Sequence, residues 1–323
     1  MKKIIFYLIF IIILIFAMPI IFTNKFQTEE VSSEEFMEEK FNYGEYNIIK
    51  LLHVESGIVE EIELDNYLCG VVASEMPASF ELEALKAQAV VARTYTIYQI
   101  KNGKKHENAD ICNNSQCCQA WISKENRLAR WEENLRTEYW NKIVKSVNET
   151  KGKIILYNNE PINALFHSNS GGKTELSVNV WGGIFPYFQT VETAGEDAYT
   201  SYNSEVTFSR SEFIQIMSEK YADFHIDFEK ENCIKILQYT ESGRIGKIKI
   251  GNKEFSGIEA RTLFGLKSTK FVFEINGDYI KFLVTGYGHG VGMSQCGSDV
   301  LAKSGKKFDE IIKFYYRDIE ISE

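Results

Sequence analysis

The segment from Tyr67 to Tyr95 constrains the fold most strongly, because a single acidic residue stands where two hydrophobic patterns meet. Leu68 to Ala73 is a short apolar run with two valines, which favours a buried strand. Pro77 disfavours helical geometry at the residue before it, so the chain is expected to turn directly after Glu75. An alanine-rich run follows and predicts a closely packed helix, with Ser79 as its N-cap. Glu75 is therefore expected at a strand end among apolar residues.

This position makes Glu75 a candidate general acid. Desolvation raises the pKa of a carboxyl group, so that the group can hold a proton near neutral pH. The ordinary alternative is that Glu75 caps the next helix or pairs with a lysine. From the chemistry of one residue alone, the ordinary role is the more common one.

Four segments carry motifs, and their order along the chain is informative. They are LCGVVASEMP (68–77), LKAQAVVARTY (85–95), HSNSGGKTE (167–175) and GHGVGMSQ (288–295). Together they closely resemble the signature of the stage II sporulation protein D family, which comprises membrane-anchored peptidoglycan lytic transglycosylases of spore-forming bacteria. The match extends over nearly all of the chain after the N-terminal apolar segment. The resemblance implies that Glu75 is the catalytic acid.

The later motifs predict the substrate-binding side of the site. His167 and Ser168 would face Glu75 if their strands are neighbours, and the glycines of both motifs let the backbone approach a ligand closely. The competing interpretation is that His167 and His289 are ordinary packed histidines. With the resemblance included, the expected substrate-binding residues are Arg93, His167, Ser168, Gly171, Gly172, Tyr287, His289, Ser294 and Gln295.

The number of suitable acids bears on the reaction. A glycoside hydrolase usually needs two carboxyl groups that flank the bond. A lytic transglycosylase can use one, because the C6 hydroxyl of the muramoyl sugar attacks its own anomeric carbon and no water has to be positioned. Glu75 is the one acid in a clear motif, and Glu175 is the best second candidate.

A polar loop from Lys101 to Trp121 holds His106, Cys112, Cys117 and Cys118. Thiolates and an imidazole at short spacing are good zinc ligands. A disulfide from Cys112 to one of the adjacent cysteines is the alternative in an extracytoplasmic segment. Some members of the resembled family bind zinc in this loop through one histidine and two cysteines. This implies His106, Cys112 and Cys118 as ligands, with the choice between Cys117 and Cys118 open and a structural role for the metal.

The N-terminus predicts a membrane anchor. Residues 1–24 carry two lysines followed by an apolar run long enough to cross a bilayer, which would place the N-terminus in the cytoplasm and the remainder outside. A cleaved signal peptide is the alternative, but no clear cleavage motif is present. Residues 25–45 are acidic and are typical of a tether, and residues 46–323 would form the extracytoplasmic catalytic domain.

The remaining pattern predicts an α+β fold: mixed, largely antiparallel sheets with packed helices, and a catalytic cleft between sheet and helices. We expect one amphipathic helix over 126–148, a capping box at Ser209, and hairpins that turn at 158–161, 241–243 and 276–278. An aromatic cluster at 180–188 is more typical of a core than of a sugar-binding surface. The net charge of −9 argues against nucleic-acid binding.

The leading functional prediction is therefore cleavage of the MurNAc–GlcNAc bond of peptidoglycan during forespore engulfment. The resemblance implies its partners: glycan strands without stem peptides, a sporulation cell-wall amidase, and a membrane protein that recruits both. The family is also related to amidase enhancers, so a non-catalytic glycan-binding role is the alternative. A zinc hydrolase centred on His106 and the cysteines is a third hypothesis.

Overall fold

The computed structural model describes residues 43–103 and 105–322. The predicted membrane anchor lies outside these residues, and so does the predicted tether except for its last three positions. No helix in the described part of the chain combines the length and apolar character that a membrane crossing requires.

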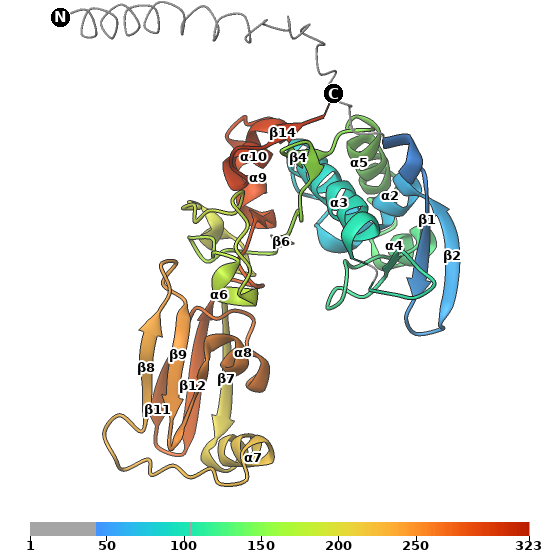
Figure 1. Ribbon diagram of the computed structural model, residues 1–323. Helices are drawn as coiled ribbons and strands as arrows, with labels where there is room; N and C mark the ends of the chain where they lie inside the picture. Colours follow the sequence, from blue (N-terminus) through green and yellow to red (C-terminus); the bar gives the residue numbers. More distant parts are fainter. Residues whose placement is uncertain (1–42, 104, 323) are drawn as a thin grey trace, which may run out of the picture. The chain divides into compact units, whose positions relative to one another are not determined.

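A bundle of helices forms the first hydrophobic core (Figure 1). The long helix α3 (Leu82–Asn102) contacts α2 (Leu64–Glu75), α5 (Arg136–Asn148), α9 (Gln295–Lys303) and α10 (Phe308–Tyr315). Its alanines are buried without taking up space, so the neighbouring helices can approach its backbone closely. An early helix, α2, and the last helix, α10, therefore pack on the same central helix.

The strand predicted at Leu68–Ala73 is wrong, because this run is the buried middle of α2. A short apolar run suits a buried helix as well as a buried strand, since both are covered on all sides. Here α2 begins directly after a strand, and Gly70 in the middle of α2 lies against a neighbouring loop. A Cβ on Gly70 would overlap the indole nitrogen of Trp121. The helix ends at Glu75, as the proline predicted, and Glu81 rather than Ser79 is the N-cap of α3.

Small sheets border this helical core. β1 (Ile48–His53) pairs antiparallel with β2 (Ile58–Glu63) and parallel with β3 (Ile111–Cys112). β4 (Ile155–Tyr157) lies between β5 (Glu160–Pro161) and β14 (Glu320–Ile321). The predicted helix over 126–148 is in fact two helices, α4 (Lys124–Arg130) and α5, separated by a turn.

A second hydrophobic core is built from two three-stranded antiparallel sheets and two helices (Figure 1). One sheet has the order β10-β9-β8 and the other the order β11-β12-β7. The predicted capping box at Ser209 and the hairpin that turns through Gly277 are confirmed. The elements are β7 (Asn203–Ser209), α7 (Arg210–Lys220), β8 (Ile234–Tyr239), β9 (Ile245–Ile250), β10 (Lys253–Ser256), α8 (Gly257–Leu263), β11 (Phe271–Asn276) and β12 (Tyr279–Thr285).

Two short parallel strands bring the later motifs together. β6 (Phe166–His167) pairs with β13 (Met293–Ser294), so that His167 lies opposite Ser294. The short helix α6 (Val178–Trp181) and a 3-10 turn (Glu196–Ala198) follow β6 in the chain. The α+β class with mostly antiparallel pairing is thus confirmed, with β1–β3 and β6–β13 as parallel exceptions.

A cavity of about 640 Å³ lies beside the second hydrophobic core, between the outer face of the β11-β12-β7 sheet and the β8–β9 hairpin. None of the residues predicted for the catalytic or substrate-binding site lines it. This cavity is therefore separate from the chemistry predicted for Glu75.

The fully buried Arg93 ties the helical core together, which predicts the effect of removing it. Its guanidinium donates to the carbonyls of Thr150 and Val147, at 2.8 and 3.3 Å, and to Asp65 at 3.1 Å. Arg93→Met removes these buried hydrogen bonds together with the ion pair to Asp65, so we expect the free energy of unfolding in urea to fall by about 3 kcal/mol or more. Arg130→Met, at an exposed position, should change it by less than about 0.5 kcal/mol. A folded, stable Arg93→Met variant with weakened glycan binding would instead support the predicted substrate role.

Candidate functional site

Glu75 is the last residue of α2 and is largely shielded from solvent. Burial raises its pKa to about 7, against the lowering effect of hydrogen bonds from the Ala120 amide and the Gln295 side chain. The Ala120 N–H donates to Oε1 at 2.6 Å. The C-terminal end of a helix carries partial negative charge, which also disfavours the carboxylate. Glu75 thus has the property required of a general acid, although it lies at a helix end and not at the predicted strand end.

Gln295 connects Glu75 to the glycine-rich motif. It is the first residue of α9, and its amide also donates to the Gln88 side chain of α3 at 3.3 Å. The residue before it, Ser294, is opposite His167 in the β6–β13 pair. The structure therefore brings the first, third and fourth motifs into one contiguous region. Gln295, which the sequence predicted to bind substrate, hydrogen-bonds the candidate acid Glu75.

His167 and His289 pack against each other, with ring centroids 5.7 Å apart. Nδ1 of His167 donates to the Val291 carbonyl at 3.1 Å, and Nδ1 of His289 accepts from the Val291 amide at 3.1 Å. The other nitrogen of His289 bonds to the carbonyl of Phe166. Burial lowers the pKa of His167 well below its usual range and that of His289 to about 3, and the nearby arginine charges act in the same direction. Both rings are therefore neutral, and neither supplies a proton.

The remaining predicted residues have varied surroundings. Ser168 accepts the Cys296 amide at its carbonyl, and Gly171 and Gly172 both have positive φ. Tyr287 is exposed, and Ser294 is fully buried as the N-cap of α9. Arg93 is inaccessible and bonded to the protein itself, so the structure does not bring it to the surface near Glu75.

Glu196 is a buried organising residue that sequence reasoning missed. Its carboxylate accepts hydrogen bonds from the Ser170 amide and hydroxyl, from the Gly172 amide, and from the hydroxyls of Thr193 and Ser294. It thereby joins the HSNSGG segment to the MSQ segment. No motif surrounds it in the sequence, and of its partners only Thr193 is close to it in the chain.

Glu175, the second acid considered for catalysis, is also buried and fully engaged. Its Oε1 accepts from the Leu176 amide at 2.7 Å and from the Asn179 amide group at 2.8 Å. Its Oε2 accepts from Thr240 and Ser242, at 2.6 and 2.7 Å. These four donors hold Glu175 in a structural position between α6 and the β8–β9 turn.

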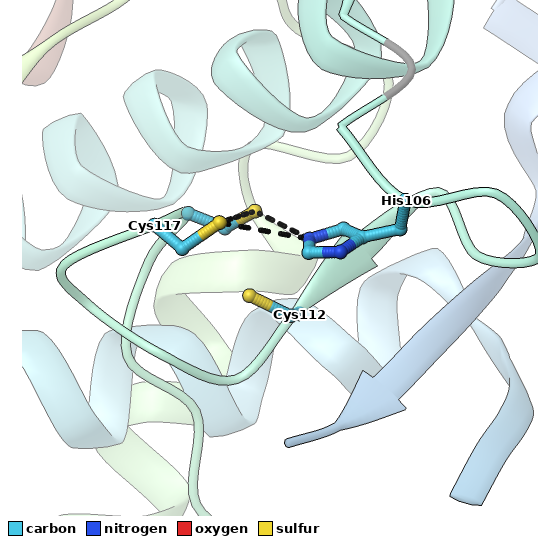
Figure 2. A group of neighbouring side chains, drawn as sticks. His106, Cys112 and Cys117 are labelled. Atoms are coloured by element: carbon cyan, nitrogen blue, oxygen red, sulfur yellow. Dashed lines mark hydrogen bonds between the residues drawn. The ribbon is translucent and has the colours of Figure 1, made fainter. Parts of the chain in front are cut away.

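His106, Cys112, Cys117 and Cys118 converge, with their ligand atoms all within 4.8 Å of one another (Figure 2). Nε2 of His106 is 3.7 Å from the sulfur of Cys117 and 3.6 Å from that of Cys118, and the two sulfurs are 3.9 Å apart. All six cysteines, which lie in the described residues, are free thiols, so the disulfide alternative is not formed. The cluster can hold a metal ion, and both adjacent cysteines belong to it.

The metal-ligand loop and Glu75 are directly connected. Ala120, whose amide binds Glu75, follows Cys118 by two residues. Between them, the buried Gln119 donates to Tyr67 at 3.0 Å and to Thr96 at 2.8 Å, which anchors the loop to α2 and α3. The shape of this loop therefore determines where the hydrogen-bond donor to the acid lies.

Comparison with known proteins identifies a matching family and several similar proteins. The family described as "Stage II sporulation protein" matches residues 53–157. Stage II sporulation protein D of Bacillus subtilis (strain 168) is 37% identical over 268 residues, which is 82% of this chain and 76% of that protein. Its counterpart in Bacillus amyloliquefaciens is 34% identical, over 82% of this chain and 76% of its own length.

A more distant relative carries a different name. The amidase enhancer of Bacillus subtilis (strain 168) is 28% identical over 77% of this chain, but this covers only 39% of the enhancer. The order of the motifs, the position of Glu75 and the similarity over most of both chains lead to one assignment: this protein belongs to the stage II sporulation protein D family.

Proposed function

We propose that this chain is a lytic transglycosylase that cleaves the MurNAc–GlcNAc bond of peptidoglycan and leaves 1,6-anhydroMurNAc ends during sporulation. The observation that carries the proposal is Glu75, a largely buried acid with a pKa near 7 at the junction of the motifs. Such a group is protonated in a large fraction of molecules at neutral pH and can lose its proton during a reaction.

In the proposed reaction, Glu75 protonates the glycosidic oxygen as the bond to the anomeric carbon breaks. The resulting carboxylate then accepts the proton of the C6 hydroxyl, whose oxygen bonds to the same anomeric carbon. The Ala120 amide, 2.6 Å from Oε1, stabilises the carboxylate between these steps. The proton given to the leaving group is thus recovered, and no water is consumed.

The surroundings of two other buried acids, Glu175 and Glu196, support a one-acid mechanism. Glu175 accepts four hydrogen bonds, and Glu196 accepts bonds from three hydroxyls and two amides. Neither carboxylate is available to position a water molecule against a sugar. A classical hydrolase would need such a second acid.

The second candidate function is that of a glycan-binding amidase enhancer. It is favoured by the similarity to the amidase enhancer over 77% of this chain. This function requires glycan binding but no acid at position 75. Replacing that acid therefore separates the two functions.

We further propose that the His106 cluster binds zinc in a structural role. In a tetrahedral site with bonds of about 2.3 Å to sulfur and 2.0 Å to nitrogen, ligand atoms lie about 3.5–3.8 Å apart. The separations of 3.6, 3.7 and 3.9 Å among His106, Cys117 and Cys118 agree with this geometry, and the sulfur of Cys112 lies within 4.8 Å of all three ligand atoms. Four protein ligands close the coordination sphere, so the zinc-hydrolase hypothesis loses its open position. The metal would hold the loop that presents the Ala120 amide.

The cellular setting is also a proposal. The apolar N-terminal segment would anchor the chain in the cell membrane with the catalytic domain outside. The partners would be glycan strands stripped of stem peptides, a sporulation amidase and a recruiting membrane protein. The family membership and the amidase-enhancer relative support this setting.

Product analysis tests the reaction. The purified chain is incubated with glycan strands lacking stem peptides, beside Glu75→Gln and, as a control, the exposed Glu55→Gln. We expect 1,6-anhydroMurNAc ends by mass spectrometry from the parent and the control, and at least about a 100-fold lower rate from Glu75→Gln. Reducing ends would show hydrolysis instead. Binding without cleavage by all three proteins would favour the enhancer function.

The raised pKa of Glu75 predicts the pH dependence. Because the protonated form is active, kcat/KM should fall about tenfold per pH unit above pH 7. The pKa in the folded state exceeds the ordinary value of 4.5, so the protonated group favours folding below that value, and this stability is lost as the pH rises through 7. Glu75→Gln should therefore gain stability over the parent above pH 7, as measured by urea unfolding at pH 6 and pH 8.5. An equal effect at both pH values would show an ordinary carboxyl group.

Metal analysis tests the cluster. The purified chain should contain one equivalent of zinc, and Cys117→Ser and Cys118→Ser should each lose most of it. Cys233→Ser, a half-buried thiol in the second core, is the matched control and should retain the metal. If Cys117→Ser retained its full zinc content while Cys118→Ser lost it, the ligands would be the three predicted ones, His106, Cys112 and Cys118.

A further inference from the structure

Trp181 is a large aromatic side chain that the fold leaves exposed beside the histidine pair. About 54% of its surface is accessible, whereas Tyr187 and Phe188, in the same aromatic segment, are buried in the first core. Its ring lies 5.0 Å from that of His289, at an interplanar angle of 61°. His289 in turn contacts His167. The segment thus divides into core residues and one aromatic side chain at the surface.

The turn that carries Trp181 is firmly held. Glu175 binds the Leu176 amide and the Asn179 side chain, at 2.7 and 2.8 Å, and is itself held by the β8–β9 turn. Ser177 donates to the Gly183 carbonyl at 2.8 Å, and Gly182 ends α6 in the left-handed region, with φ of 75°. An exposed indole on a fixed backbone loses little conformational freedom when it binds a ligand.

A second exposed aromatic side chain is close in sequence to the ring that Trp181 contacts. Tyr287 is 41% exposed, and the ammonium group of Lys267 lies 4.5 Å from its ring centre. Both nitrogens of His289 are occupied by backbone groups, so this ring supports Trp181 through packing alone. Tyr287 is thus a second exposed ring, with a cation over its face, two residues along the chain from the ring that Trp181 contacts.

The position of this surface links it to the candidate acid. The strand that ends at His167 pairs with Ser294, and the next residue, Gln295, hydrogen-bonds Glu75. A pyranose ring has an apolar face of C–H groups and a rim of hydroxyls, which suits an indole face with polar neighbours.

We propose that Trp181, together with Tyr287, is a sugar-binding subsite on which a pyranose of the glycan strand stacks. This proposal rests on the proposed function for the identity of the polymer, and it assigns the binding of one sugar to residues outside the acid's own contacts. The exposed Val178 and Ile184 near Trp181 suit a protein partner instead. The contacts that lead from Trp181 through His289 and His167 to the Ser294–Gln295 segment beside Glu75 favour the glycan.

The test measures binding without catalysis. Full-length Glu75→Gln protein is titrated with glycan strands lacking stem peptides, and affinity is measured by the change in tryptophan fluorescence and by co-sedimentation. Trp181→Ala in this background should weaken binding about tenfold or more, and Trp181→Phe should retain most of the affinity. Ile184→Ala, at an 81% exposed position of the same segment, is the control and should change affinity less than about twofold.

Each outcome decides the proposal independently of cleavage. Equal affinity of Trp181→Ala and its parent, with unchanged circular dichroism, would overturn it and leave the patch to a protein partner. Equal losses for Trp181→Ala and Ile184→Ala would also overturn it, because general apolar contact would then explain binding. If the wild-type protein binds glycan but does not cleave it, the proposed transglycosylase activity is wrong. The effect of Trp181→Ala on binding then still tests the subsite. If Glu75→Gln shows no glycan binding, both proposals fail.

Discussion

The buried carboxylate of Glu196 holds the candidate site together. It accepts hydrogen bonds from Ser170, Gly172 and Thr193 on one side and from Ser294 on the other, and is almost completely inaccessible. A buried charge with several donors is stable, whereas the same charge with one donor missing is costly. Because these donors come from two distant motifs, the carboxylate enforces the pairing of β6 with β13. That pairing places Gln295 beside Glu75 and the two histidines beside each other.

The glycines of the last motif make this pairing possible. A Cβ on Gly292 would overlap the carbonyl oxygen of Leu165, and one on Gly290 would lie 2.6 Å from the Arg244 guanidinium. Arg244 is buried beneath the loop and donates to the Ser170 carbonyl and the Ser268 hydroxyl, at 2.6 Å each. Its charge, with that of Arg261, helps to keep His289 neutral. The glycines of the motif thus allow the loop to pack closely around a buried cation.

Glu75 differs from His289, because its environment favours the protonated form of the side chain. Burial outweighs two hydrogen bonds and raises its pKa to about 7. One of these bonds comes from the metal-ligand loop and the other from α9, so segments on both sides of the acid determine its position. A structural metal in that loop would act on catalysis only through the Ala120 amide. In this way a metal bound by the four candidate ligands would influence the proposed reaction without taking part in it.

The sequence by itself determined the family, the capping box at Ser209 and the hairpin at Gly277, and it singled out Glu75 and the cysteine loop as candidates, because each depends on residues close together in the chain. It placed Leu68–Ala73 in a strand, since a short buried run has no period that separates helix from strand. Only the tertiary structure decided that Cys117 and Cys118 both join the metal cluster and that Arg93 and Ser294 are buried. Only the fold revealed Glu196 and separated the exposed Trp181 from the buried Tyr187. These features depend on partners up to about 100 residues away, such as Ser294 for Glu196, and local sequence carries no signal for such contacts.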